Sequence, residues 1–280
     1  MSSLPTSKLA RNTNLSKIGP AFVDMPDGST YVIKRLMAPG KSNAKLRKNG
    51  ARYLTLGLSL APHKLGGVGN LCPHASDGCI KLCLNVSGRA MMQTKDHTIE
   101  RARIARARLY FQDRPLFLAM LRRELFLAVK LAKRKNLRAI ARLNVLSDID
   151  WARVHPEIIR DFPQVIFYGY TKIPGAMSRF ADGAYPENYY LTFSRSETNE
   201  QTAIDFLNRG YNATVVFNTR YSSKSKQPLP TTWNGFPVID GDVNDLRFLD
   251  PRGVVVGLRA KGLARRVENQ VGGFVVKVAQ

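Results

Sequence analysis

The segment YLTLGLSLAPHKLGGVGNLCPHASDGCIKLC, residues 53–83, joins a predicted β-strand to a glycine-rich loop that carries every cysteine of the chain. The strand is rich in leucine and ends at Pro62, because proline cannot donate to the hydrogen bonds of a sheet. An odd number of cysteines leaves one thiol over in any set of disulfides. We therefore expect Cys72, Cys79 and Cys83 to share a metal or cluster whose last coordination position is open or filled by another ligand.

Further β-rich runs follow this strand, and helical segments lie between them, which predicts parallel βαβ units. The runs are AIARLNVL (139–146), VIFYGYT (165–171), YYLTFS (189–194), ATVVFN (213–218) and GVVVGLRA (253–260). About six strands in all are fewer than the eight of a complete barrel. The expected fold class is α/β, with a partial or irregular (βα) barrel whose cysteine-cluster loop follows the first barrel strand. An open doubly wound sheet is the alternative.

Two helices are predicted between the cysteines and the second strand. They meet near Gln112, because Asp113 and Pro115 form a helix-start signal. The second helix should pack on a sheet through one apolar face. That face carries Leu118, Leu121, Leu125 and Val129.

The chain is strongly basic, with 43 Lys and Arg against 21 Asp and Glu, a net charge of +22 and a pI near 10.3. Such a field concentrates polyanions, so we expect nucleic acid, DNA or RNA, as a partner. A generally basic proteome is the alternative explanation. Candidate phosphate contacts lie in the segment ERARIARAR, which could equally form a solvated helix face. They are Arg101, Arg103, Arg106 and Arg108.

No stretch approaches the ~20 apolar residues of a membrane-spanning helix, and the N-terminus does not resemble a secretory signal. We expect a cytoplasmic protein without a membrane partner, in a compartment that keeps cysteines reduced. Residues 1–18 are predicted to be a flexible basic arm and residues 19–280 a single α/β domain. Within it we expect an iron–sulfur cluster loop at 65–89 and an exposed loop at 220–237.

Three states of the cysteine segment compete. A [4Fe–4S] cluster on three thiolates leaves one iron open, whereas zinc would need His74 as a fourth ligand in the pattern C-P-H-x4-C-x3-C. Neutral thiols without metal are the third state. The cysteines follow a strand at what would be the carboxyl edge of a parallel sheet, where ligand sites of α/β folds gather. This position favours the cluster.

Polar residues also end three successive predicted strands. Ser147, Asp148 and Asp150 follow the first, and either a ligand contact or capping of the next helix explains the aspartates. Lys172 ends the second, after Tyr170 and Thr171, and Arg195 ends the third, between Ser194 and Glu197. The aspartates of IDGDVNDLRFLD (239–250) lack the pattern of a calcium loop and are expected to serve turns and caps.

Two resemblances follow from these motifs. The order strand, three-cysteine loop, helix, strand resembles the radical S-adenosylmethionine superfamily. More specifically, LSLAPHKLGGVGNLCPHASDGCIKLCLNVSGR (58–89), RLNVLSDIDW (142–151), VIFYGYTK (165–172) and LTFSRSE (191–197) resemble a phage-encoded family, the gene product 88-like proteins, whose reaction is not established. The superfamily's usual spacing is C-x3-C-x2-C, whereas this chain has C-x6-C-x3-C and no Gly-Gly-Glu turn.

The resemblance implies a [4Fe–4S] cluster on Cys72, Cys79 and Cys83, with S-adenosylmethionine as a further cofactor near Ser147, Asp148, Lys172 and Arg195. The first hypothesis is a non-catalytic, regulatory iron–sulfur protein that binds nucleic acid, a role favoured by the absence of the Gly-Gly-Glu turn. The second is a radical S-adenosylmethionine enzyme that modifies nucleic acid or protein. The third is a zinc-stapled nucleic-acid-binding protein.

Overall fold

The structure is a computed structural model that describes residues 18–42, 46–86, 97–219, 227–266, 268 and 272–278. The predicted arm at 1–18 therefore lies almost entirely outside the described residues, as do 87–89 of the cysteine loop and 220–226 of the predicted exposed loop. None of the helices within the described ranges has both the length and the apolar composition that crossing a membrane requires.

Nine strands form one mixed sheet in the order β3-β4-β5-β6-β7-β8-β11-β10-β9, and β1 and β2 form a separate antiparallel hairpin. The strands from β4 to β10 in this order are parallel, and β3 and β9 add antiparallel edges. The sheet strands are β3 (Met37–Pro39), β4 (Tyr53–Leu58), β5 (Arg138–Arg142), β6 (Ile166–Thr171), β7 (Tyr189–Ser194), β8 (Ala213–Phe217), β9 (Thr232–Trp233), β10 (Phe236–Asp240) and β11 (Val255–Arg259). The hairpin strands are β1 (Ala21–Asp24) and β2 (Thr30–Ile33).

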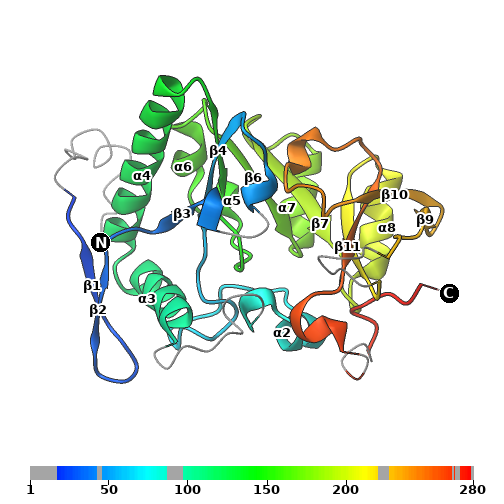
Figure 1. Ribbon diagram of the computed structural model, residues 1–280, viewed down its shortest axis with the longest axis horizontal. Coiled ribbons are helices and arrows are strands. Elements are labelled where there is room, and N and C mark those ends of the chain that lie inside the picture. The colour runs from blue at the N-terminus through cyan, green and yellow to red at the C-terminus, as the bar shows by residue number, and fades with distance from the viewer. Residues whose placement is uncertain are drawn as a thin grey trace.

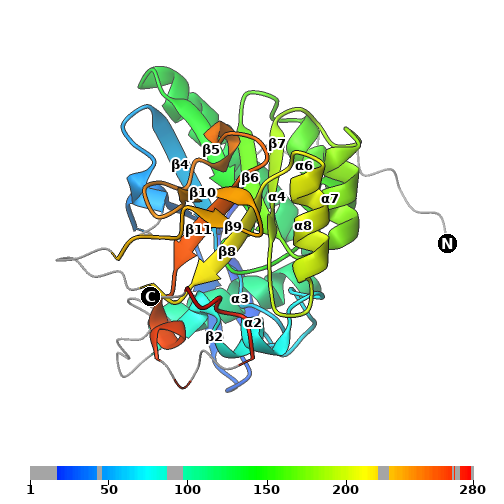
Figure 2. The same cartoon turned by 90° about the vertical axis from the view of Figure 1, so that its right-hand side faces the viewer.

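Strand order follows chain order from β4 to β8, and right-handed crossovers in such an order place the connecting helices on one face. Figure 2 shows α6, α7 and α8 along one side of the sheet. A doubly wound sheet reverses its strand order at a switch point, and no reversal occurs between β4 and β8. The six predicted strands are all present, and the mixed α/β class is confirmed.

The helices cover the sheet through their apolar faces. α4 packs on β4 and β5, α7 on β6 and β7, and α8 on β7 and β8 (Figure 1). The helices are α2 (Asp77–Lys81), α3 (Thr98–Gln112), α4 (Arg114–Arg134), α5 (Trp151–Val154), α6 (Pro156–Arg160), α7 (Pro174–Ala181) and α8 (Glu200–Asn208). Short 3-10 turns are η2 (Gly40–Ser42), η3 (Leu46–Lys48), η4 (Leu84–Val86), η6 (Arg247–Leu249) and η7 (Gly262–Arg265).

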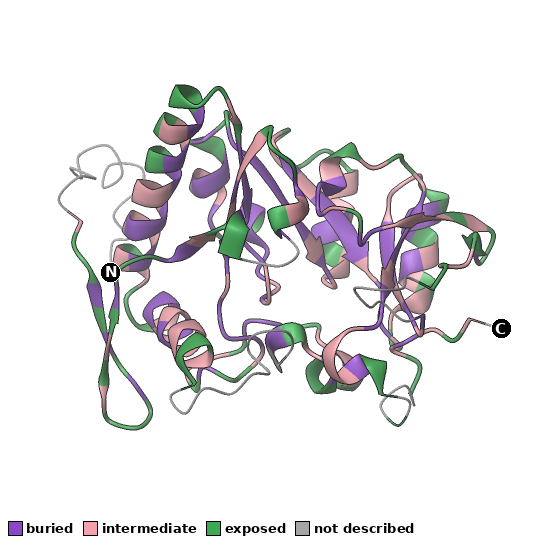
Figure 3. Cartoon of the chain, viewed as in Figure 1, coloured by how far each residue is buried: buried purple, intermediate pink, exposed green. Residues whose placement is uncertain are grey.

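The predicted boundary between the two long helices is confirmed. Asp113 caps α4 by accepting the N–H of Leu116 at 3.0 Å, and Pro115 occupies its first turn. Leu121 and Leu125 of the predicted apolar face are buried, and the strands beneath form the main core (Figure 3).

The predicted exposed loop at 220–237 differs from the structure in its second half. Residues 227–237 are mostly exposed, but they contain β9 and the start of β10, and the side chain of Trp233 is buried. Trp233 pairs with Phe236 across a tight turn at Asn234 and Gly235, both at positive φ. Strands as short as those around this turn have too few residues to show an alternation of polar and apolar side chains, so the composition predicted a loop.

Candidate functional site

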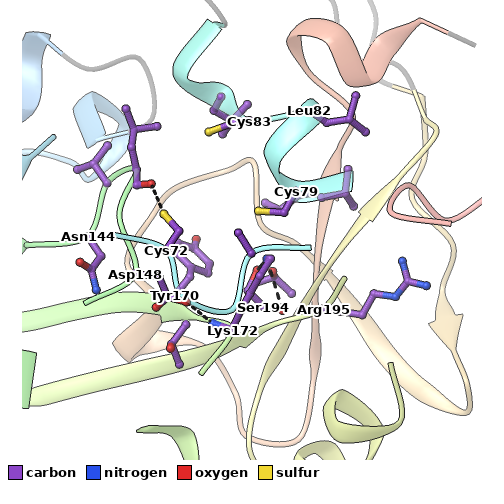
Figure 4. Close-up of a pocket in the computed structure, with 18 of the residues that line it drawn as sticks. Cys72, Cys79, Leu82, Cys83, Asn144, Asp148, Tyr170, Lys172, Ser194 and Arg195 are labelled. Atoms are coloured by element: carbon purple, nitrogen blue, oxygen red, sulfur yellow. Dashed lines mark hydrogen bonds between the residues drawn. The ribbon is translucent and has the colours of Figure 1, made fainter. Parts of the chain in front are cut away.

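A cavity of about 220 Å³ opens at the carboxyl edge of the sheet. Its walls come from the ends of β5, β6, β7, β8 and β11 and from the segment that contains α2 (Figure 4). Among the residues that line it are Cys72, Cys79, Cys83, Ser147, Asp148, Lys172 and Arg195. The structure thus brings the predicted cysteines and the predicted strand-end residues to one cavity.

The three cysteines reach the cavity from one loop. Cys72 lies between two strand-end loops, where its Sγ accepts the N–H of His63 at 3.3 Å and donates to the carbonyl of Leu146 at 3.5 Å. Cys79 belongs to α2, and Cys83 lies two residues after the end of this helix. Figure 4 shows the three sulfur atoms facing a common space.

Burial controls the protonation of these thiols. It raises the pKa of Cys72 to about 12, and it also raises the pKa of Cys79 and of Cys83, although the Lys172 ammonium acts in the opposite direction on both. Metal ligation by cysteine needs the thiolate, so binding would release these protons.

A carboxylate holds the short helix that carries Cys79. Glu197, after β7, accepts the N–H of Gly78 at 2.7 Å and the hydroxyl of Ser76 at 2.8 Å, and Ser76 in turn caps α2 by accepting the N–H of Cys79 at 3.2 Å. A Cβ at Gly78 would lie 2.7 Å from both Glu197 Oε1 and Phe274 Cβ. The glycine between the cysteines is therefore required by close packing.

Asp148 has one carboxylate oxygen without a protein partner. Its Oδ2 accepts the backbone N–H of Lys172 at 2.8 Å, and its own N–H donates to the carbonyl of Leu71 at 2.8 Å. Oδ1 is buried and makes no hydrogen bond with the described residues. Burial raises the pKa of this carboxyl. An orphaned acceptor on a cavity wall is a feature that a ligand donor would satisfy.

Asn144, which was not among the predicted site residues, shapes the loop that presents Asp148. Its Oδ1 accepts the Ser147 hydroxyl at 2.9 Å, the N–H of Ile149 at 3.2 Å and the indole N–H of Trp151 at 3.0 Å. Ser147 is therefore bonded within its own loop.

Asp150 does not line the cavity and does not cap the following helix. It is buried, and its carboxylate accepts from Arg179 at 2.6 Å and from the Tyr185 hydroxyl at 2.6 Å. It makes no side-chain cap to α5.

Lys172 and Arg195 differ in how they are engaged. The Lys172 ammonium donates to Ser194 Oγ at 2.5 Å, and no carboxylate of the described residues forms an ion pair with it. The Arg195 guanidinium points away from the cysteines (Figure 4). It pairs with Glu200 and donates to the carbonyl of Phe274 at 3.1 Å. Arg195 thus attaches the segment 272–278 to the end of β7.

Three further cations line the cavity and were not among the predicted residues. Arg142 forms an ion pair with Asp245 at 2.9 Å. Arg259 pairs with Asp240 at 2.8 Å and with Asp242 at 3.4 Å, and Lys261 also pairs with Asp242. A sequence signal for two of these cations was available, because an arginine interrupts an apolar β-rich run in each case: Arg142 in AIARLNVL and Arg259 in GVVVGLRA.

The expectation that the aspartates at 239–250 serve turns is right only for part of the set. Asp240 Oδ1 accepts the N–H of Asp242 at 2.9 Å, as an Asx turn requires. Asp242 and Asp245 instead have fully buried side chains that pair with cavity-lining cations, and Asp245 also accepts the Tyr170 hydroxyl at 2.8 Å. Local sequence could not reveal this because the partners lie far away in the chain.

The arginines predicted to contact nucleic acid all donate to groups within the chain. Arg101 pairs with Asp27, and Arg108 Nε donates to the carbonyl of Asp24 at 2.6 Å, so both hold the β1–β2 hairpin. The other two bind backbone carbonyls: Arg103 that of Asn85 at 2.8 Å and Arg106 that of Arg35 at 3.2 Å. Their role toward nucleic acid stays a prediction.

The donor set does not suit a single metal ion. Across the described residues, no group of three or more His, Cys, Asp and Glu side chains is placed to hold one. His74, the expected fourth zinc ligand, is exposed and is not part of the cavity lining. A Cys₃His zinc site is therefore not assembled within the part of the chain that the structure describes.

Comparison with known proteins gives one result. Neither the search of curated proteins nor the search of solved structures found a match. The relation to the radical S-adenosylmethionine superfamily accordingly stays a prediction. A family model described as Gene product 88 matches residues 33–275. Because this match covers well over half of the chain, the protein belongs to the Gene product 88 family.

Proposed function

We propose that this protein is an iron–sulfur protein in which Cys72, Cys79 and Cys83 hold a [4Fe–4S] cluster beside a small-molecule pocket. The observation that carries the proposal is the convergence of three sulfur atoms on one cavity at the carboxyl edge of the sheet. In such a cluster each cysteine sulfur binds a different iron, whereas in a zinc site every sulfur lies ~2.3 Å from the same ion. The cysteine sulfurs around a cluster are therefore farther from one another than those around a zinc ion. A cluster therefore fits a donor set that is not arranged for a single ion.

Anaerobic purification followed by iron and sulfide analysis tests this proposal. We expect about four irons and four sulfides per chain, and a sharp loss of both in Cys72→Ser, Cys79→Ser and Cys83→Ser. His74→Ala is the matched control and should keep the cluster, because His74 lies outside the cavity lining. Stoichiometric zinc without labile sulfide would refute the proposal and favour the zinc alternative.

A second candidate function, a radical S-adenosylmethionine enzyme on a partial (βα) barrel, is favoured by Asp148. Its buried Oδ1 lacks a hydrogen-bond donor, and the amino group of the cofactor would supply one. Lys172, which no carboxylate of the described chain pairs with, would face the cofactor's carboxylate. The cluster would supply the electron for reductive cleavage of the cofactor.

Electron paramagnetic resonance of the reduced protein separates these two functions. S-adenosylmethionine should shift the cluster signal, and the isosteric variant Asp148→Asn should weaken the shift. Asp182→Asn is the control, because Asp182 forms an exposed ion pair with Arg209. An unshifted signal at saturating cofactor, with no 5′-deoxyadenosine formed under dithionite, leaves the non-catalytic, regulatory function.

Nucleic-acid binding belongs to both functions and is supported by the net charge of +22. Phosphate neutralisation makes such binding fall steeply with salt. We expect an oligonucleotide affinity that is weakly selective for sequence and decreases linearly on a log–log plot against salt concentration. An affinity independent of salt would contradict this part of the proposal.

A further inference from the structure

We propose that the cavity contains a second ligand site, specific for a phosphate group, on a surface formed by Arg142, Arg259 and Lys261, which we name the cation wall. These residues come from the end of β5, the end of β11 and the loop after it. All three line the same cavity as the cysteines.

The cation wall is built into the fold. Arg142 and Arg259 are 9% and 5% exposed, so both are largely withdrawn from bulk solvent although they line a cavity. The carboxylates that pair with the wall, Asp240, Asp242 and Asp245, do not line the cavity, and the side chains of Asp242 and Asp245 are fully buried. Each ion pair therefore has its positive member toward the cavity and its negative member behind.

The ion pairs carry no net charge, so their orientation decides the sign of the electrostatic potential in the cavity. Cations at a surface backed by buried acids form a dipole layer whose positive side faces the cavity, and charges act more strongly where water is excluded. The acids also fix the side chains in place, so a ligand need not order them. Buried ion pairs contribute little net stability. Stabilisation of the fold is therefore a weak explanation for the two buried pairs of this wall, Arg142–Asp245 and Arg259–Asp242.

Hydrogen-bonding capacity remains on this surface at Arg259, whereas the three guanidinium nitrogens of Arg142 already donate to Asn144, Asp245 and Val145. Arg259 donates through Nε to the carbonyl of Gln227 at 2.8 Å and through Nη1 to Asp240 and Asp242. Its Nη2 makes no hydrogen bond with any described residue. Arg142 lies over the ring of Tyr170, with its guanidinium carbon 4.6 Å from the ring centroid.

These features specify the chemistry of the ligand. A guanidinium with free donors beside a lysine matches the oxygens of a phosphate. The apolar side chains of Val216 and Leu258 line the cavity too, and they would contact an organic group attached to that phosphate. The ligand class is thus a phosphorylated organic molecule, either a free nucleotide or a nucleotide of a nucleic-acid strand.

Calorimetric titration of the full chain tests the site, with adenosine 5′-monophosphate and a short single-stranded oligonucleotide as probes. We expect saturable binding of at least one probe. Lys261→Gln, which changes a half-exposed side chain, and Arg259→Gln should each weaken it about tenfold or more, as the loss of a charge-assisted contact predicts. Arg209→Gln, in an exposed ion pair with Asp182, is the control and should bind normally.

The two probes and the metal content of the protein separate the possible outcomes. Binding of the mononucleotide alone identifies a small-molecule site, whereas an oligonucleotide that competes with it identifies a nucleic-acid end. No saturable binding of either probe overturns the proposal, as does equal affinity of wild type and Lys261→Gln. Protein purified without iron or sulfide should still show saturable binding, so the site survives a failure of the iron–sulfur proposal.

Discussion

The cavity joins two surfaces of opposite construction: the cation wall and a cysteine wall, which we define as Cys72, Cys79 and Cys83. In the cation wall Arg142 and Arg259 end strands of the main sheet and Lys261 follows β11, and fully buried aspartates hold all three. In the cysteine wall only Cys79 lies in the five-residue helix α2, whereas Cys72 precedes this helix and Cys83 lies between it and the turn η4. One carboxylate, Glu197, anchors α2. The difference indicates that the cation wall forms with the fold, whereas the cysteine wall depends on local contacts and on what it binds.

Removing the buried partner of the cation wall should have the largest effect on stability. Asp245→Ala leaves Arg142 as an uncompensated buried charge and removes the acceptor of Tyr170, so we expect a loss of about 3–5 kcal/mol in the free energy of unfolding. Urea unfolding measures this change. Asp182→Ala, which breaks an exposed ion pair, serves as the control and should barely alter the midpoint. Equal midpoints for both variants would mean that the buried aspartates do not stabilise the cation wall.

A methyl group at Gly78 should disturb the cysteine wall alone. The added Cβ of Gly78→Ala would overlap the Glu197 carboxylate and Phe274, so we expect the free energy of local opening to fall by about 1–3 kcal/mol. In metal-free protein, alkylation of Cys79 and Cys83 should accelerate about tenfold while the urea midpoint changes little. Gly169→Ala, whose methyl would meet nothing within 4 Å, is the control. A large drop in the midpoint would show that both walls unfold together.

A milder change at the same anchor should have a smaller effect. Glu197→Gln keeps the side-chain size but replaces a charge-assisted acceptor of Gly78 and Ser76 with a neutral one. We expect local opening to become easier by about 1 kcal/mol. Hydrogen exchange of the Gly78 amide measures it, and the exchange of amides in β6 serves as the internal reference. Unchanged exchange at Gly78 would mean that Glu197 does not anchor α2.

The smallest effect concerns pH. The pKa of Cys72 is about 12 in the folded protein, whereas an unfolded cysteine has a pKa of about 8.5. Between these values the folded state holds a proton that the unfolded state has lost. The stabilisation is thus fully present below about pH 8.5 and is lost as the pH rises toward 12. Urea midpoints of metal-free protein at pH 8 and pH 9 should differ less in Cys72→Ala than in wild type, and an identical difference would contradict the burial of this thiol.

The sequence predicted the parts of the fold that local patterns encode. The six β-rich runs became strands, and Asp113 and Pro115 marked the helix boundary because capping uses residues only three apart. The convergence of the cysteines with Asp148 and Lys172 followed from a general property of parallel sheets, whose carboxyl ends share an edge.

Long-range pairing accounts for what the sequence did not predict. Asp245 looked like a turn residue because nothing nearby in the sequence reveals its partner Arg142, which lies at the end of β5. The arginines of α3 looked like a solvated or nucleic-acid-binding face because the hairpin that accepts from Arg101 and Arg108 is far away in the chain. Helical periodicity shows that a face is polar, but it does not show which segment covers it.

The segment 272–278 has a consequence for how the protein is made. The N–H of Val276 donates to the carbonyl of Val216 in β8, and the N–H of Asn218 donates to the carbonyl of Val276. Phe274 lines the cavity and packs against Gly78. A ribosome synthesises this segment after the three cysteines and after every strand of the sheet. The nascent chain can therefore form both long helices and most of the sheet while the cavity still lacks one side. Insertion of the proposed cluster into a finished site has to wait until residues 272–278 leave the exit tunnel.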